Sequence, residues 1–213
     1  MPQPLASKIE SWLVEAQLAR AEIERGCAIA ARAELAAVYV KPHYIETAKK
    51  NLKETRVKIG AVIAFPLGGM TTAAKMFETQ DALTRGADEI AMMLNIGALR
   101  DADDLAVKND ISAVVKTARG HDVTVIIETP DLNDDEKTRA CQIAEAAGAA
   151  FVQTSSGFAG DATYNDVRLL WRTLSRAQIK VAGAIDALPM VSKLIEAGAA
   201  RVATNKVEML FRD

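Results

Sequence analysis

The sequence predicts an α/β fold, a single (β/α)8 TIM barrel formed by residues 1–213. Three segments repeat one design, in which a glycine and an alanine separate a helical pattern from a short apolar run: Gly86-Ala87, Gly148-Ala149 and Gly198-Ala199. The glycine fits the left-handed cap after a helix, and the alanine lets the next strand pack closely beneath it. No Pro/Gly/Ser-rich linker divides the chain. Because successive strand–helix units connect with right-handed crossovers, a closed barrel is the natural solution.

The expected strands are short apolar or β-branched runs, and the expected helices have apolar residues at helical spacing. Residues 6–34 predict a mostly helical segment that precedes or includes a first strand near 9–14. The other strands are expected at 36–41, 57–65, 89–94, 123–129, 150–152, 179–186 and 201–206. Helices are expected at 43–52, around Lys75 and Glu78, at 101–119, from 133 onward and at 163–176.

The composition is that of a globular protein, with 50% hydrophobic and 25% charged residues. A net charge of −2 gives no basic surface for nucleic acid, which is not expected as a partner. No apolar tract of membrane-spanning length occurs, and residues 1–4 lack the pattern of a signal peptide, so a cytoplasmic protein without membrane contact is expected. Cys27 and Cys141 lack metal-ligand spacing, and neither a metal nor a cofactor is expected.

The segment 150–158 is the most informative part of the chain. An apolar run breaks at Gln153 into small hydroxyl residues and Gly157, as at the carboxyl end of a buried parallel strand, where chemistry usually lies. The segment resembles the sixth-strand motif of the deoxyribose-phosphate aldolase family, Phe-Val-Lys-Thr-Ser-Thr-Gly-Phe. The resemblance implies that Gln153 replaces a lysine that forms a Schiff base with the substrate. A carboxamide cannot form an imine, because its nitrogen lone pair is delocalised into the carbonyl group.

The resemblance covers roughly residues 35–206 and at least six strands in consecutive order. Segment 88–95 resembles Asp-Glu-Ile-Asp-Met-Val-Ile-Asn, which implies that Ala91 replaces an aspartate used in proton transfer. Segment 179–186 resembles Val-Lys-Ala-Ser-Gly-Gly-Ile-Arg, which implies that Lys180 is a retained family lysine. Residues 9–16 keep only apolar positions of the first-strand motif, so its polar contacts are expected to be lost.

A polar ligand site is expected at the carboxyl ends of the strands. By the resemblance, the residues that would bind a substrate or its phosphate are Thr154, Ser155, Gly157, Gly183, Ala184, Thr204, Asn205 and Lys206. Asn95 and Glu128 close two other strands and are possible pocket residues.

Three hypotheses for function follow. In the first, the barrel has lost lysine-dependent aldolase chemistry and binds a small polar, possibly phosphorylated metabolite. In the second, it remains an aldolase or lyase that uses Lys180 as the amine. In the third, it is a non-catalytic partner subunit of an active homologue. The resemblance also implies a homo-oligomer.

Overall fold

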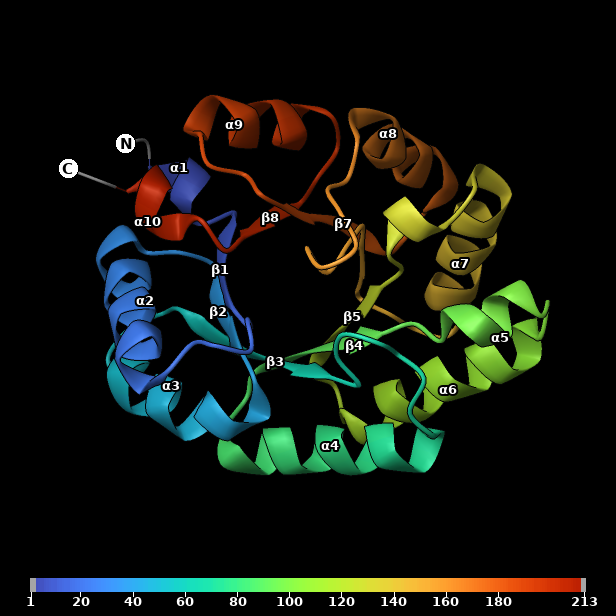
Figure 1. Ribbon diagram of the computed structural model, residues 1–213, viewed down its shortest axis with the longest axis horizontal. Coiled ribbons are helices and arrows are strands. Elements are labelled where there is room, and N and C mark those ends of the chain that lie inside the picture. Colours follow the sequence, from blue (N-terminus) through green and yellow to red (C-terminus); the bar gives the residue numbers. More distant parts are fainter. Residues whose placement is uncertain (1–2, 212–213) are drawn as a thin grey trace.

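The computed structural model describes residues 3–211 of the chain, and it forms a closed barrel. Eight parallel strands pair in sequence order, and β1 pairs with β8 to close the sheet. Figure 1 shows the helices as an outer ring around the strands, with both chain ends on the same side. The predicted (β/α)8 architecture is confirmed.

The strands are short, and their partners are fixed by register around the whole barrel. Their bounds are β1 Ile9–Leu13, β2 Ala37–Val40, β3 Lys58–Ile63, β4 Glu89–Met93, β5 Asp122–Ile126, β6 Phe151–Gln153, β7 Gln178–Gly183 and β8 Arg201–Thr204. Two pairings matter for the site: Gln153 of β6 lies opposite Lys180 of β7, and Lys180 lies opposite Arg201 of β8. Side chains at paired positions of parallel strands point to the same face of the sheet.

The helices cover the outer face of the barrel. They are α1 Gln3–Ala6, α2 Arg20–Ala33, α3 Ile45–Leu52, α4 Thr72–Arg85, α5 Ile96–Arg100, α6 Asp104–Thr117, α7 Asp134–Ala146, α8 Tyr164–Thr173, α9 Leu188–Glu196 and α10 Val207–Leu210, with 3-10 turns η1 Pro42–Tyr44 and η2 Thr129–Asp131. Within the described part of the chain, no helix has the length and apolar character needed to cross a bilayer.

Several predicted boundaries are wrong, for local reasons. The segment 6–34 does include the first strand predicted near 9–14, as β1, but its long helix begins only at Arg20. The helix expected at 101–119 begins at Asp104, because the side chain of Asp103 caps it by accepting the backbone N–H of Ala106. The strand expected at 123–129 ends at Ile126, and Glu128 takes a left-handed conformation with φ of 58° before η2.

The glycine joints are confirmed. Gly86, Gly148 and Gly198 have φ of 110°, 94° and 117°, values that L side chains rarely adopt. In each case the following strand begins within three residues of the glycine. The joints therefore fix where β4, β6 and β8 enter the sheet.

Two apolar clusters hold the fold together. The larger lies between the strands and the helices, and the smaller fills the barrel interior. In the smaller cluster the rings of Trp12 and Tyr39 stack with centroids 4.9 Å apart. Gly60 of β3 makes room for this stack, since a Cβ atom there would lie 2.3 Å from the Tyr39 ring.

We expect Gly60→Ala to destabilise the protein by about 1–3 kcal/mol, because the added methyl group overpacks the ring of Tyr39. Gly69→Ala is the matched control, since a Cβ atom at Gly69 meets nothing within 4 Å. Urea unfolding of both variants measures the difference. Equal free energies of unfolding for the two variants would contradict the packing described here.

Candidate functional site

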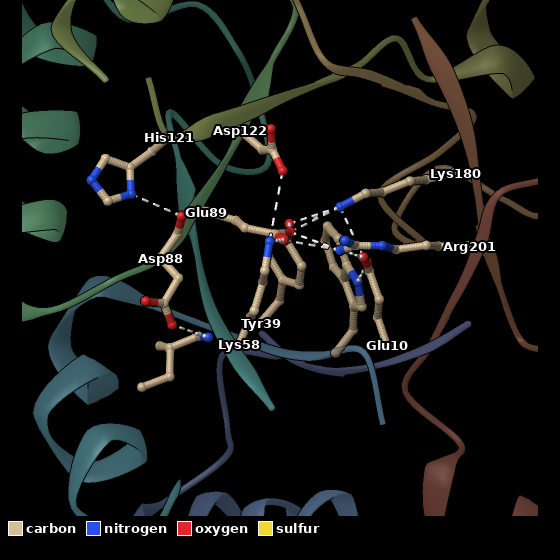
Figure 2. A network of polar contacts seen from close by, with 11 residues as sticks. Glu10, Tyr39, Lys58, Asp88, Glu89, His121, Asp122, Lys180 and Arg201 are labelled. Atoms are coloured by element: carbon tan, nitrogen blue, oxygen red, sulfur yellow. Dashed lines mark hydrogen bonds and ion pairs between the residues drawn. The ribbon is translucent and has the colours of Figure 1, made fainter. Parts of the chain in front are cut away.

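A cluster of charged side chains lies inside the barrel, below its apolar layer. The Lys180 ammonium group is 2.8 Å from Glu10 Oε1 and 3.4 Å from Glu89 Oε2, and all three side chains are almost completely buried. Arg201 contacts both carboxylates from β8, at 3.0 and 2.9 Å. Figure 2 shows Lys180 and Arg201 reaching from neighbouring strands toward Glu10 and Glu89. The two cations and two anions thus form one paired group.

Two further residues, Tyr39 and Lys58, contact this cluster. The hydroxyl of Tyr39 accepts a hydrogen bond from Lys180 at 2.8 Å and donates one to Glu89 at 2.8 Å. Lys58 pairs with Glu89 Oε1 at 2.9 Å from the more exposed end of the cluster. Buried charges are tolerated when they are paired and hydrogen-bonded, and both conditions hold here.

Glu10 corrects the expectation that the polar contacts of the first strand are lost. Its side chain points into the barrel, is fully buried, and accepts contacts from Lys180, Arg201 and the Trp12 indole N–H. The first-strand motif therefore keeps one carboxylate. The sequence carries only a weak signal for this, a single acidic residue within an otherwise buried strand.

The cluster shifts the ionisation of its members in consistent directions. Burial alone raises the pKa of Glu89, but the charges of Lys180 and Arg201 and the hydrogen bonds from Lys58 and Tyr39 lower it to about 2. Burial and the two neighbouring carboxylates raise the pKa of Tyr39 well above its ordinary value. The carboxylates raise the pKa of Arg201 in spite of its burial. The Glu89 carboxyl group is therefore ionised within the cluster at neutral pH.

Gln153 and Ala91 occupy the interior without offering acid–base or nucleophilic groups. Gln153 is fully buried, its Nε2 donates to the carbonyl of Ser155 at 2.7 Å, and its Oε1 has no partner among residues 3–211. Ala91 belongs to the inner apolar cluster with Trp12 and Tyr39. A methyl group transfers no proton and a carboxamide forms no imine, so Ala91 supplies no acid–base group and Gln153 supplies no amine.

A cavity of about 140 Å³ opens at the carboxyl ends of β6, β7, β8 and β1. Its lining residues are Trp12, Val14, Glu15, Ser156, Gly157, Phe158, Asp161, Ala182, Gly183, Ala184, Ala203, Thr204 and Asn205. Five residues predicted for the ligand site are among them: Gly157, Gly183, Ala184, Thr204 and Asn205. The structure thus brings together the strand-end positions that the resemblance implies.

The other predicted ligand residues do not line this cavity. Thr154 Oγ1 accepts the backbone N–H of Ala182, and Ser155 Oγ donates to the Ala182 carbonyl, so both hydroxyls join β6 to β7. Lys206 is exposed beyond the end of β8. Asn95 caps α5 by accepting the N–H of Ala98.

Glu128 holds the loop after β6 rather than facing the cavity. Both of its oxygens accept the backbone N–H of Ser156, at 3.1 and 3.2 Å. Burial raises the pKa of this carboxyl group, against the opposing effect of the Ser156 hydrogen bonds. It lies two residues beyond the end of β5, and its observed contacts hold the backbone of the loop after β6.

Trp12, Glu15 and Asp161 belong to the cavity, and sequence reasoning missed them. Trp12 separates the cavity from the charged cluster, because it lines the cavity while its indole N–H donates to Glu10 Oε2 at 3.3 Å. Lys180 and Gln153 do not line the cavity. Within the part of the chain described, no three His, Cys, Asp or Glu side chains are placed to hold a metal ion.

The closed barrel, the interior lysine and the strand-end cavity define a (β/α)8 protein of the aldolase type. A family model described as DeoC/LacD family aldolase matches residues 9–206. The chain belongs to this family.

Named relatives agree with this assignment. A deoxyribose-phosphate aldolase from Staphylococcus epidermidis is 44% identical over 202 residues, covering 94% of this chain and 92% of the relative. One from Bdellovibrio bacteriovorus is 42% identical over 203 residues, with coverages of 94% and 92%. A tetrameric deoxyribose phosphate aldolase structure from Aeropyrum pernix superposes with a TM-score of 0.91 at 25% identity, covering 99% of this chain and 90% of that one.

We expect Lys180→Met to lower the free energy of unfolding by about 3–5 kcal/mol, because it leaves Glu10 and Glu89 buried with too little positive charge. The exposed pair Arg25–Glu208 is the control, and Glu208→Gln should cost less than about 1 kcal/mol. Urea unfolding at pH 7 measures both effects. A loss below 1 kcal/mol for Lys180→Met would show that the cluster does not depend on its lysine.

The lowered pKa of Glu89 predicts a loss of stability in acid. A carboxylate with a folded pKa near 2 and an ordinary value of 4.5 stabilises the fold fully above about pH 4.5, and this contribution falls as the pH drops toward 2. It amounts to roughly 3 kcal/mol, at 1.36 kcal/mol per pKa unit. Urea unfolding from pH 7 down to pH 2.5 should therefore give a shallower pH dependence for Glu89→Gln than for the unchanged protein. Identical slopes would contradict the assignment.

Proposed function

We propose that this chain is a ligand-binding member of its family that has lost lysine-dependent aldol chemistry. The observation that carries the proposal is Gln153, buried inside the barrel at the position where the resemblance puts the imine-forming lysine. Its carboxamide cannot condense with a carbonyl compound. The relatives' reaction does not pass to this chain with their fold, because activity depends on the residues of the site.

Lys180 does not replace the missing amine. Its Nζ already contacts Glu10 and Glu89 within 3.4 Å and donates a hydrogen bond to the Tyr39 hydroxyl at 2.8 Å, so a carbonyl compound would have to displace these buried partners to reach it. Nζ also lies 4.3 Å from the centroid of the Phe151 ring and 4.8 Å from that of Tyr39, so aromatic rings occupy the space beside it. These contacts count against the hypothesis of an aldolase that uses Lys180.

The restricted access to Lys180 and the lack of a proton-transfer group also count against an aldol reaction. A carbonyl compound in the cavity has Trp12 between itself and the lysine, and Trp12 is held by stacking on Tyr39 and by its bond to Glu10. Even with an amine in reach, Ala91 offers no carboxylate for the proton transfers of an aldol reaction.

The cavity supports the binding part of the proposal. It is partly enclosed, it has apolar and polar walls, and it lies at the carboxyl end of the strands, where (β/α)8 proteins place their ligands. A small polar metabolite is the class of ligand that its size admits.

The partner-subunit hypothesis and the homo-oligomer stay predictions. The relative from Aeropyrum pernix is described as tetrameric, and this supports testing the size of the present protein in solution. Co-purification with a lysine-bearing homologue would favour the partner role.

We expect no imine to form on Lys180. The protein is incubated with acetaldehyde and sodium cyanoborohydride, and tryptic peptides are analysed for an ethyl group on each lysine. Exposed lysines react slowly and serve as an internal reference, and the aldolase from Staphylococcus epidermidis serves as the positive control. Cleavage of deoxyribose 5-phosphate should be at least about 10⁴-fold slower than with that relative, since both the nucleophile and a proton-transfer group are missing.

Rapid modification of Lys180 relative to exposed lysines would reject the proposal, and so would cleavage at the relative's rate. If cleavage is seen, the Lys180→Met variant shows whether it depends on this amine, provided that circular dichroism first shows the variant to be folded, because the substitution is expected to destabilise the protein.

A further inference from the structure

The cavity at the barrel mouth has an unusual balance of hydrogen-bonding groups. Around it, backbone N–H groups are already bound to acceptors of the protein itself. These are the N–H groups of Ser156, Gly157, Phe158, Ala184 and Lys206. An anion such as phosphate requires free donors of this kind, so the bonds inside the protein compete with it.

Asp161 makes the most direct of these contacts. Its Oδ1 accepts the backbone N–H of Ala184 at 2.7 Å, just beyond the end of β7. The same oxygen would lie 2.7 Å from a Cβ atom at Gly183, so the glycine gives the carboxylate the space it needs. The resemblance places a substrate phosphate beside these two residues. Here a carboxylate of the chain itself occupies that place.

Hydrogen-bond acceptors in the cavity lining, in contrast, remain available to a ligand. Glu15 uses Oε1 to accept a hydrogen bond from Asn205, while its Oε2 is buried and has no partner among residues 3–211. Asp161 also lines the cavity and accepts the backbone N–H of Ala184 with its Oδ1. None of the described residues that line the cavity is Lys or Arg. A ligand that donates hydrogen bonds and carries positive charge therefore matches this lining.

The apolar wall fits the same kind of ligand. Trp12 and Phe158 both line the cavity, and aromatic rings attract cations through the negative potential of their faces. A cavity of about 140 Å³ lies below the size of about 300–1,000 Å³ that is usual for ligand pockets. The group recognised is thus a small one.

We propose that the mouth cavity binds a small ligand with an ammonium group, and that Asp161 sets this preference by filling the anion-binding position beside Gly183 and Ala184. The inference rests on the proposed ligand-binding function and names its ligand class. It gives Asp161 the role of a specificity-determining residue. The ligand assigned to the cavity is thus an amine and not a phosphorylated compound.

Fluorescence of Trp12 tests the proposal. The chain has two tryptophans, and Trp171→Phe leaves Trp12 as the only reporter, at the cavity wall. Ethanolamine, ethylene glycol and glycolate have the same number of non-hydrogen atoms to within one and differ in charge. We expect ethanolamine to change the fluorescence saturably, with a Kd at least tenfold lower than those of ethylene glycol, glycolate and inorganic phosphate.

The gap between the two ligands is the ratio of the glycolate Kd to the ethanolamine Kd. Asp161→Asn should reduce this gap at least tenfold, because it removes one of the two carboxylates. Asp135→Asn is the matched control: Asp135 is exposed at the start of α7 and does not line the cavity, so the gap should change less than twofold. Circular dichroism checks the folding of each variant. If Asp161→Asn fails to fold, Glu15→Gln gives the same readout at the second carboxylate.

Tighter binding of glycolate or phosphate than of ethanolamine by the parent protein would overturn the inference, as would the absence of a saturable response to ethanolamine. An unchanged gap in Asp161→Asn would remove the role of Asp161. These outcomes are separate from the imine test, because an adduct on Lys180 rejects the proposed function whatever the cavity binds.

Discussion

The pairing of charges inside the barrel is the constraint on which the rest of the site depends. Glu10, Glu89 and Lys180 are buried and Arg201 is mostly so, and these charges are acceptable only because their partners lie within about 3 Å. The lysine that the family resemblance marks as retained lies between the two carboxylates, 2.8 Å from Glu10 and 3.4 Å from Glu89. A side chain held between two carboxylates is well placed to stabilise a fold and poorly placed to attack a carbonyl group.

Trp12 links this constraint to the cavity above it. Its ring stacks on Tyr39, and Tyr39 bonds to Lys180 and Glu89, so the aromatic pair is fixed from below by the charged cluster. From above, the same ring is a wall of the mouth cavity. The barrel interior therefore holds a charged layer, bordered by the more exposed Lys58, and a small open site, with Trp12 between the two.

Much of the fold was predictable from the sequence, because its signals are local. Glycine caps such as Gly148, apolar runs and helical spacing each depend on a few neighbouring residues, and the structure confirms them. Gln153 and Lys180 were found because they lie within recognisable strand motifs. Glu10 and Asp161 were missed because their partners are distant in the chain: Arg201 lies 191 residues from Glu10, and Ala184 lies 23 residues from Asp161. Barrel closure creates such pairs, and periodicity within a segment does not reveal them.

An amine ligand, as proposed for the mouth cavity, would mean that a site changes its ligand while its backbone stays the same. Strand-end glycines and small residues keep the shape of a ligand site, and Gly157 and Gly183 still line it. What differs is which hydrogen-bonding groups remain free. A carboxylate bound to the Ala184 N–H consumes a donor and adds negative charge in one step, so a single side chain reverses the electrostatic character of the position. Specificity here thus depends on the internal partners of the backbone as much as on the shape of the cavity.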